Sequence, residues 1–337
     1  MTPYTLSDGR IAHAFQLTDE LAGGGTFGAR VLQWGACLQD VRHSAVPHAL
    51  TMGVEDLTLY EGPMATAGGL IGPVVNRISG AAATLDGRAY AFEPRADSGG
   101  ATLHSGSAGT HRKLWEIVEH GPRHVTLRID TPDGEGGFPG NRTATARYEV
   151  AGPALTLTVE AETDAPTWIN FANHSYWNLD GSETIAGHAL VSPAERYLPA
   201  NEEGLVNGRI EDVEGTPLDF REGRGVKPGP PHLDHALVLA DGRRALAPAA
   251  VLTGASGLRL EIDTTEPSIQ GYDGWKLKDV GAPDHQGRAI GAHRALALEC
   301  QGWPDAPSHD RFPSVRLDPG ETYRQMTVWR VVPPDAS

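Results

Sequence analysis

The 337-residue sequence predicts an all-β fold, a large antiparallel β-sandwich, from two features of its residue pattern. The 41 glycines and 25 prolines punctuate the chain often enough to suit many short strands joined by turns. Apolar and polar residues alternate in many segments, whereas no apolar stripe of helical period runs beyond about three turns. Such alternation is typical of antiparallel sheets that cover one face.

The alternating segments are separated by turn residues. Residues 26–42 alternate around Trp34-Gly35-Ala36, and residues 81–92 form two runs about Asp86-Gly87, which is a signal for a type I′ hairpin. Two further pairs flank Gly-Pro dipeptides, and five more segments complete the set. These expected strands are 113–119, 124–130, 143–150, 154–162, 236–240, 248–253, 258–263, 293–300 and 322–332.

Three polar, irregular regions are expected to be long loops: 93–112, 180–235 and 271–292. Loops of that length in a compact domain are often functional or carry extra strands. No linker-like run, internal repeat or low-complexity tract divides the chain, so we expect a single domain over residues 1–337.

The composition of the chain limits the kinds of molecule that the protein is expected to bind. The net charge is −15 and no basic patch is visible, which argues against nucleic acid and anionic membranes and favours neutral small molecules or proteins. No apolar run approaches the roughly 20 residues of a membrane span, and the N-terminus lacks a signal-peptide pattern, so we expect a cytoplasmic protein. Cys37 and Cys300 form no metal-ligand spacing, and the sequence leaves open whether they lie close enough to pair. It does not indicate an oligomeric state.

The segment from Ala295 to Asp305 is the first candidate for chemistry. Alanine and leucine alternate into Glu299, and Gly302 and Pro304 then break the strand. A carboxylate at the end of a rigid apolar strand can be aimed and can have a shifted pKa, as a general base requires. The alternative is a strand-end glutamate that faces water.

Four further clusters carry polar groups of the kind that recognise oxygen-rich ligands. Asn76 and Arg77 stand side by side in a glycine-bounded segment, and His104 lies in a turn of small residues. Residues 173–179 interleave Asn, His and Ser with Tyr and Trp, so that aromatic faces can stack on a sugar while polar groups read its hydroxyls. Residues 232–235, His-Leu-Asp-His, suit either a metal ion or sugar hydroxyls. The plain alternative for each cluster is a structural turn or a buried polar network.

Taken together, these motifs resemble those of the aldose 1-epimerase (galactose mutarotase) family. The N-R-I, L-H-G-G, N-H-[ST]-[YF]-[FW]-N-L, D-H and E-x-Q…P-D-A patterns of that family match this chain in the same order, at residues 76–78, 103–106, 173–179, 234–235 and 299–306. With the final strand the resemblance covers about residues 30–332. It implies the mutarotase-like β-supersandwich with a groove on one sheet, which agrees with the expected strands.

The resemblance implies a function and a role for each residue. Glu299 takes the proton from the anomeric hydroxyl of a free aldose, and His174 protonates the ring oxygen. The ring then opens, the C1–C2 bond rotates, and the ring recloses as the other anomer. We expect the acid and the base on opposite sides of the sugar, with His174 protonated in the free enzyme. The substrate-binding residues are Arg77, His104, Asp234 and Asn76, and no cofactor or metal is expected.

The chain departs from the family pattern near its first histidine. Ser105 replaces a glycine of L-H-G-G, and Thr110-His111 replaces the usual Phe-Asp that follows a glycine. We therefore expect activity on neutral hexoses or pentoses, with a preference different from plain galactose.

Three other functions remain open at this point. The first is a sugar-binding or sugar-sensing protein of the same fold without turnover, which the presence of both Glu299 and His174 disfavours. The second is a metal enzyme that uses His104, His174, His235 and Glu299, although these residues lack the short spacing usual in such sites. The third is a glycoside hydrolase with Asp234 and Glu299 as its two carboxylates.

Overall fold

The computed structural model describes residues 1–334, so the last three residues of the expected 1–337 domain lie outside it. Within residues 1–334 the structure is built from strands, and every ladder between them is antiparallel. Helical structure in the same residues is confined to short 3-10 turns. These are η1 (Leu57–Glu61), η2 (Ser79–Ala81), η3 (Ala96–Ser98), η4 (Gly106–Ala108), η5 (Thr110–Arg112), η6 (Glu135–Gly137) and η7 (Ala306–Ser308). The all-β prediction is confirmed.

Two of the three larger sheets make up the back and one flank of the molecule. The N-terminal sheet has the order β1-β2-β3-β4, with β1 (Thr2–Thr5), β2 (Ile11–Glu20), β3 (Thr26–Leu32) and β4 (Cys37–His43). The nine-stranded sheet has the order β10-β11-β12-β13-β27-β23-β22-β17-β20. Its strands are β10 (Glu116–His120), β11 (His124–Thr131), β12 (Arg142–Ala151), β13 (Ala154–Thr163), β27 (Tyr323–Val332), β23 (Arg259–Thr264), β22 (Ala247–Thr253), β17 (Ala189–Val191) and β20 (Arg224–Gly225).

The third sheet has six strands in the order β16-β25-β24-β21-β18-β19. They are β16 (Tyr176–Trp177), β25 (Leu296–Gln301), β24 (Ser268–Tyr272), β21 (Asp234–Val238), β18 (Arg196–Leu198) and β19 (Glu211–Asp212). Short two-stranded pairs surround it: β5 (Leu70–Ile71) with β15 (Ala172–Asn173), β6 (Arg77–Ile78) with β9 (Thr102–Leu103), β7 (Ala82–Leu85) with β8 (Arg88–Ala91), and β14 (Thr167–Trp168) with β26 (Arg316–Leu317).

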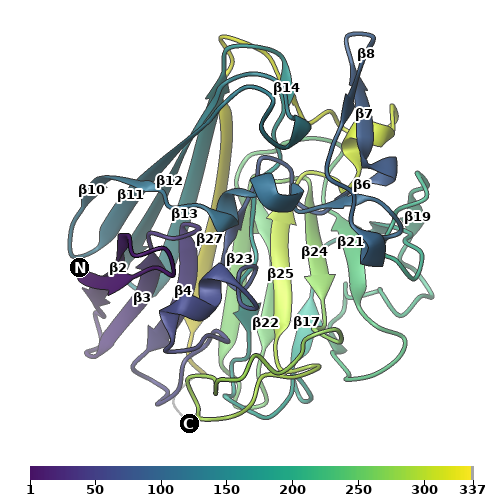
Figure 1. Ribbon diagram of the computed structural model, residues 1–337. Helices are drawn as coiled ribbons and strands as arrows, with labels where there is room; N and C mark the ends of the chain where they lie inside the picture. Colours follow the sequence, from purple (N-terminus) through teal and green to yellow (C-terminus); the bar gives the residue numbers. More distant parts are fainter. Residues whose placement is uncertain (335–337) are drawn as a thin grey trace.

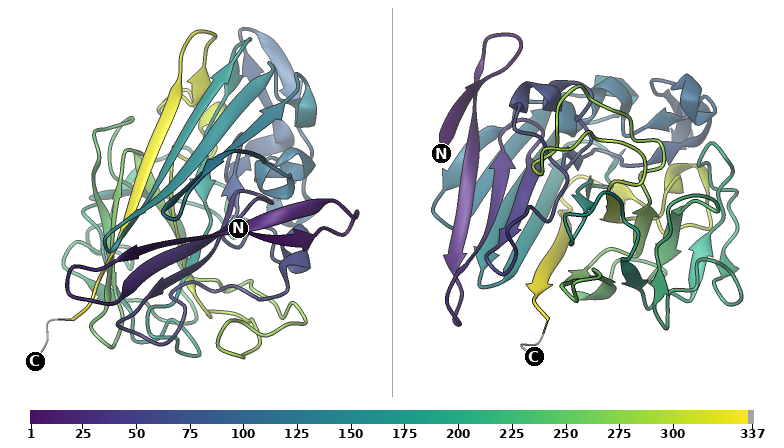
Figure 2. Two further views of the ribbon diagram at one scale, coloured as in Figure 1. Left: turned by 90° about the vertical axis from the view of Figure 1, so that its left-hand side faces the viewer. Right: turned by 90° about the horizontal axis from the view of Figure 1, so that it is seen from below.

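In space, the six-stranded sheet lies in front of the nine-stranded sheet, with β25 and β24 side by side near the centre of the molecule (Figure 1). The N-terminal strands run across the teal strands of the nine-stranded sheet when the molecule is turned by 90° (Figure 2). One large apolar cluster joins side chains from all three sheets, including Phe27 of β3, Leu157 of β13 and Leu298 of β25. The nine-stranded sheet is therefore the common wall against which the other two pack.

The expected strands are largely present. The β7–β8 hairpin turns at Asp86 and Gly87, whose φ angles of 50° and 77° are the positive values of a type I′ turn. Among the strands of five or more residues, β2 and β24 were missed, and so were several strands of two to four residues. In β2 the alternation is interrupted where Ala14 and Phe15 are both buried, and β24 is covered on both faces, which removes the period-two signal. The long region 180–235 does carry extra strands, β17 to β20 and the start of β21.

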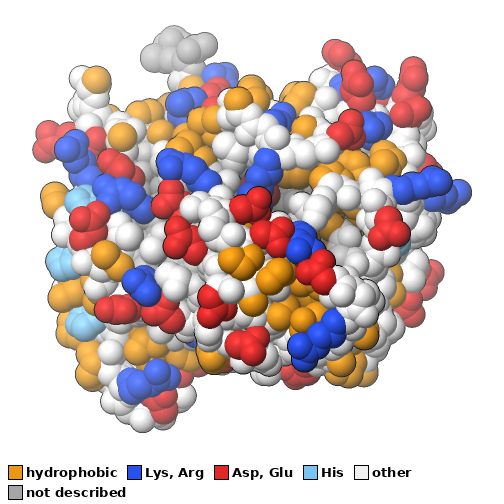
Figure 3. Space-filling view, turned by 90° about the horizontal axis from the view of Figure 1, so that it is seen from above, with side chains coloured by type: hydrophobic (Ala, Val, Ile, Leu, Met, Phe, Trp, Pro, Cys, Tyr) orange, Lys and Arg blue, Asp and Glu red, His pale blue; other side chains and the backbone are white. Residues whose placement is uncertain are grey.

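Three further observations concern the surface and the cysteines. Cys37 and Cys300 are both free thiols in the interior, so they do not pair. Among residues 1–334 no helix is long and apolar enough to cross a membrane. Acidic and basic side chains are interspersed on the face seen from above (Figure 3).

Candidate active site

A cavity of about 890 Å³ opens over the face of the six-stranded sheet that is turned away from the nine-stranded sheet. Its volume lies within the range of small-molecule sites. All six residues singled out from the sequence line it, although they come from distant parts of the chain. They are Asn76, Arg77, His104, His174, Asp234 and Glu299. The fold therefore brings every predicted site residue to one cavity.

The alternation of side chains along β25 points Glu299 into the cavity. Leu296, Leu298 and Cys300 of β25 belong to the large core, so the residues between them point to the opposite face, where the cavity lies. The strand continues to Gln301, one residue beyond the end expected from the sequence. Glu299 therefore sits in the middle of a rigid sheet and is only 2% exposed.

Gln270 is a cavity residue that the sequence analysis missed. It lies on β24 directly opposite Glu299 in the ladder, and its Nε2 donates a hydrogen bond of 2.8 Å to Oδ1 of Asp234. Ile269 beside it faces the core, so the same alternation places Gln270 toward the cavity. The sequence sign of this strand is the run from Ser268 to Tyr272. Its last two residues were assigned to a loop, because the run lacks a clear alternation of apolar and polar residues.

The β6–β9 pair positions three of the cavity residues: Arg77 begins β6, Asn76 precedes it, and His104 follows β9. Asn76, His104 and Ser105 have positive φ angles of 64°, 54° and 61°, a conformation that is costly for residues other than glycine. Hydrogen bonds hold it in place: the His104 N–H donates to the carbonyl of Asn76 (2.9 Å), and the Arg77 N–H donates to Asn76 Oδ1 (2.9 Å). Strain concentrated at a cavity is a feature of functional sites.

The Arg77 guanidinium reaches the cavity through a gap left by a glycine. A Cβ at Gly204 would lie 2.5 Å from the guanidinium carbon, and the φ of +80° at Gly204 also favours glycine. Arg77 is buried, and its Nε makes no hydrogen bond to any residue of the described chain. A buried guanidinium with unused donors is suited to hydroxyl or ring oxygens of a ligand.

The tautomer of His104 follows from one contact. The backbone N–H of Asn76 points at His104 Nδ1 at 3.1 Å, so this nitrogen accepts and the ring proton is on Nε2. Burial, followed by the positive potential of His174, His111 and Arg77, holds the pKa of His104 well below its usual range. His104 is therefore a neutral hydrogen-bond donor at neutral pH.

His174 and Glu299 touch each other: His174 Nε2 lies 3.4 Å from Glu299 Oε1. This differs from the expected placement on opposite sides of a sugar. The anomeric hydroxyl and the ring oxygen are both bonded to C1, so groups that serve these two oxygens have to be neighbours. The register of β16 against β25, with Tyr176 opposite Ala297, brings them together.

Burial sets the protonation of this pair. It raises the pKa of Glu299 to about 8, with a further upward contribution from Asp234 and an opposing one from Arg77. Burial also lowers the pKa of His174 to about 4. The expectation that His174 is protonated in the free enzyme is therefore wrong, because neither Asp234 nor Glu299 offsets the loss of hydration. Both shifts favour the form of the pair in which a single proton lies on Glu299 over the charge-separated form.

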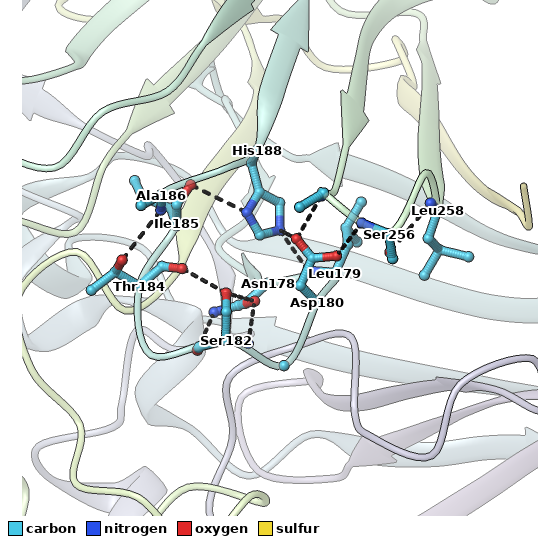
Figure 4. A network of polar contacts seen from close by, with 12 residues as sticks. Asn178, Leu179, Asp180, Ser182, Thr184, Ile185, Ala186, His188, Ser256 and Leu258 are labelled. Atoms are coloured by element: carbon cyan, nitrogen blue, oxygen red, sulfur yellow. Dashed lines mark hydrogen bonds and ion pairs between the residues drawn. The ribbon is translucent and has the colours of Figure 1, made fainter.

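A polar network behind the cavity holds the 173–179 segment. Asn178 Nδ2 donates to the carbonyl of Arg294 (2.7 Å), which ties this segment to the approach of β25. Next to it, His188 Nε2 accepts the N–H of Leu179 (2.9 Å), and Asp180 accepts the N–H groups of Ala255 and Ser256 (Figure 4). These contacts fix the backbone that follows His174 and the backbone that leads into the strand of Glu299.

The two substituted positions next to the first histidine turn away from the cavity. The Ser105 hydroxyl bonds both the N–H and the carbonyl of Val74 (3.0 and 2.9 Å), and the Thr110 hydroxyl donates to the carbonyl of Leu70 (2.7 Å). Neither lines the cavity. The expectation that they alter sugar preference therefore loses its structural basis, because both hydroxyls stabilise backbone.

The His-Leu-Asp-His motif is divided by the fold. Asp234 lines the cavity, whereas His232 and His235 do not. The suggested metal set of His104, His174, His235 and Glu299 is therefore not assembled around one point. Within residues 1–334, the only group of three or more potential ligands with atoms within 4.8 Å of one another is His232, Asp273 and His293, outside the cavity.

Comparison with known proteins shows the family to which this chain belongs. The sequence matches the family described as aldose 1-epimerase over residues 20–330. It is 32% identical to the aldose 1-epimerase of Escherichia coli (strain K12), covering 90% of this chain and 91% of that protein, and 30% identical to the galactose mutarotase of Homo sapiens, covering 95% and 94%. The crystal structure of the GalM/aldose epimerase homologue from C. elegans superposes with a TM-score of 0.86 at 28% identity, covering 96% of this chain and all of that one. The chain belongs to the aldose 1-epimerase family of isomerases.

Proposed function

We propose that the chain interconverts the α and β anomers of a free aldose, with Glu299 and His174 as the proton-transferring pair. The observation that carries this proposal is their contact at 3.4 Å inside a cavity that is large enough for a monosaccharide. Ring opening removes one proton from O1 and adds one to O5, so it requires one group that can accept a proton and one that can donate it. The pair holds one proton at neutral pH, which is the number that the reaction needs.

The reaction starts from the charge-separated form of the pair, in which the single proton has moved from Glu299 to His174. Glu299 then accepts the O1 proton while His174 protonates O5, and the C1–O5 bond breaks to leave the open aldehyde. Rotation about C1–C2 presents the other face of the carbonyl, and the same two groups reverse their transfers as the ring closes. Protons balance over the cycle, so no other reactant is consumed. Each positioned proton transfer contributes about 10²–10⁴ in rate.

The remaining cavity residues orient the sugar. His104, as an Nε2–H donor, and Arg77 are placed to bind the ring oxygen and neighbouring hydroxyls, while Asp234 and Gln270 offer an acceptor and an amide to other hydroxyls. Asn76 acts through its contacts with Arg77 and His104. Tyr272 and Trp275 add aromatic surface to the wall. A protein that only binds sugar has no need for two adjacent groups whose pKa values are shifted in opposite directions by burial, so a purely sugar-sensing role is less favoured.

Polarimetry tests the proposal. Freshly dissolved α-anomers of several neutral hexoses and pentoses are followed with and without the enzyme, and the uncatalysed rate is subtracted. We expect catalysed approach to the anomeric equilibrium for at least one free aldose, galactose included, and no release of sugar from glycosides. Hydrolysis of glycosides without mutarotation would instead favour the glycoside hydrolase with Asp234 and Glu299.

A further inference from the structure

A second cluster of histidines and a carboxylate lies at the base of the loop 273–293, outside the sugar cavity. Asp273 begins this loop directly after β24, His293 lies near its end, and His232 precedes β21. His232 Nδ1 lies 3.2 Å and His293 Nδ1 lies 3.5 Å from the same atom, Asp273 Oδ2. One ligand atom from each of the three residues lies within 4.8 Å of the other two.

The surrounding structure holds the three side chains in this arrangement. Asp273 is 1% exposed, and its Oδ1 accepts the N–H of Trp275 at 3.0 Å. The His232 ring stacks on Trp275 (4.5 Å between centroids, 8° between planes) and on His293 (5.4 Å, 17°). Two nearly parallel imidazoles therefore turn their Nδ1 atoms toward one carboxylate oxygen. His293 keeps this place in spite of a φ of +59°.

The two distances, which are long for charge-assisted hydrogen bonds, are compatible with two ligands of one metal ion. Charge-assisted N–H···O⁻ bonds are about 2.7–2.9 Å long, shorter than both contacts here. In a tetrahedral zinc site, bonds of about 2.0–2.1 Å to nitrogen and oxygen place neighbouring ligand atoms about 3.4 Å apart. The observed 3.2 and 3.5 Å lie on either side of that separation.

We propose that His232, Asp273 and His293 bind a divalent transition-metal ion of the zinc type, which clamps the two ends of the loop 273–293. Two imidazoles and one carboxylate favour zinc-type ions over magnesium or calcium, which prefer oxygen ligands. His232 is 29% exposed on its side chain, which leaves access for entry of the ion and for water as a fourth ligand.

Binding requires both histidines to carry their proton on Nε2, because each offers Nδ1 as the ligand atom. In the metal-free protein His232 Nδ1 donates to Asp273 Oδ2 at 3.2 Å, so the His232 proton has to move from Nδ1 to Nε2. The N–H of Gly229 points at His293 Nε2 at 3.2 Å, so in the metal-free protein the His293 proton is on Nδ1, beside the carbonyl of Asp273 at 3.3 Å. A metal ion on Nδ1 moves that proton to Nε2, and the Gly229 N–H then turns to water. Gly229 lies in a partly exposed turn, so this exchange is inexpensive.

The loop that the ion would clamp forms one wall of the sugar cavity. Trp275, Lys276, Leu277 and Ile290 all lie between the two clamped ends and line the cavity. None of the three ligands lines it. The metal ion is therefore expected to act on sugar affinity and thermal stability, whereas proton transfer by Glu299 and His174 proceeds without it. This inference stands independently of the proposed catalytic roles.

Calorimetric titration of the chelator-treated, dialysed full-length protein with Zn²⁺ alone tests the site. We expect one ion per chain and a rise in Tm with Zn²⁺. His232→Gln or Asp273→Asn should weaken the Zn²⁺ affinity at least about tenfold and reduce the rise in Tm. The matched control is His124→Gln. The His124 side chain is 30% exposed, and its Nε2 lies 3.8 Å from the carboxylate of Glu119. Among the described residues, His124 belongs to no group of three potential metal ligands. This control should bind Zn²⁺ like the wild type.

Titration with Co²⁺ adds a spectroscopic readout, because a four-coordinate site with two imidazoles gives a visible absorption band that the His232→Gln variant should lack. Mg²⁺ and Ca²⁺ should not compete with Zn²⁺. Absence of saturable Zn²⁺ binding below about 1 mM would overturn the proposal, as would equal affinity in His232→Gln and the control. Because Asp273 also caps the start of its loop, its variant counts only if circular dichroism shows a native fold. If it does not, the His232→Gln variant, whose side chain is partly exposed, decides the test.

Discussion

Two histidine–carboxylate pairs of this molecule each contain a buried histidine, and their carboxylates behave differently. His174 Nε2 lies 3.4 Å from Glu299, and His188 Nε2 lies 3.7 Å from Asp180. Burial lowers the pKa of both histidines. The carboxylates, however, respond in opposite directions. The pKa of Glu299 is raised to about 8, whereas that of Asp180 is lowered.

The difference lies in the hydrogen-bond partners. Burial alone would raise the pKa of Asp180, but bonds from Ser256 and from the backbone of Ala255 together outweigh that effect. His188 is also fully bonded, to Leu179 through Nε2 and to Ile185 through Nδ1 (Figure 4). In contrast, Glu299 Oε2 and His174 Nδ1 make no hydrogen bond to any of residues 1–334.

This comparison shows that burial makes a histidine–carboxylate pair, but the remaining partners decide what the pair can do. A pair whose atoms are all bonded has a fixed proton and supports structure. A pair with free lone pairs beside a cavity can pass a proton to a ligand. The following predictions separate the two pairs.

The largest effect is expected from Glu299→Gln, which keeps size and hydrogen bonding but removes basicity. The anomeric hydroxyl is a weak acid, so kcat should fall by about 10²–10⁴ while sugar binding persists. Mutarotation by polarimetry and sugar affinity by calorimetry measure the two quantities. The matched control is Asp180→Asn, which should leave kcat close to wild type and destabilise the fold by about 1–3 kcal/mol.

If Glu299→Gln retained more than about a tenth of wild-type kcat, a loss of less than about 1.4 kcal/mol of transition-state stabilisation, Glu299 would not be the base. Asp305, the nearest carboxylate after it in the chain, is not an easy substitute. It already accepts the backbone N–H and the hydroxyl of Ser79.

The next effect concerns the histidines. His174→Asn should lose most of kcat and still bind sugar, whereas His188→Gln should retain kcat and lose stability. His104→Asn should affect KM more than kcat, because His104 is a neutral donor through Nε2. A larger kcat loss in His104→Asn than in His174→Asn would exchange the roles assigned to these two residues. Polarimetric kcat and KM for the three variants, with thermal unfolding, separate these outcomes.

A smaller effect is expected in the pH profile. Between about pH 4 and about pH 8 the His174–Glu299 pair holds one proton, so kcat/KM should fall below the first value, where no base remains, and above the second, where no acid remains. The negative charge of Asp234 raises the pKa of Glu299, so Asp234→Asn should move the alkaline limit to lower pH. Asp279→Asn, another change in the cavity wall, should leave that limit in place. An unmoved limit in Asp234→Asn would contradict this account.

Much of this site was predictable from sequence because its residues sit on elements with strong local signals. Glu299 follows an alternating strand, and His174 lies in an unusual aromatic and polar segment. The contact between them was not predictable, since it depends on the register of β16 against β25. Gln270 was missed for a related reason: β24 is buried on both faces, so its sequence does not alternate.

The pKa values were also beyond sequence reasoning. The sequence suggested that carboxylates near His174 would keep it charged, but the full burial of both partners reverses that balance. The cluster of His232, Asp273 and His293 was also not predictable from the sequence. The motif at 232–235 suggested a metal site among neighbours in sequence, whereas the fold pairs His232 with residues more than 40 positions away.

The smallest expected effect is that of metal removal on the chemical step. The proposed proton transfers of ring opening need only Glu299 and His174, and the only three-ligand set in the described residues lies outside the cavity. Exhaustive chelation should therefore leave kcat unchanged, although KM and Tm can shift if the loop 273–293 loses its clamp. Saturation kinetics before and after chelation, with Zn²⁺ added back, separate the two quantities. A kcat that falls on chelation and returns only with Zn²⁺ would place a metal ion in the reaction itself. If chelation changes only KM and Tm in the wild type and changes neither in His232→Gln, the ion acts by holding the loop 273–293.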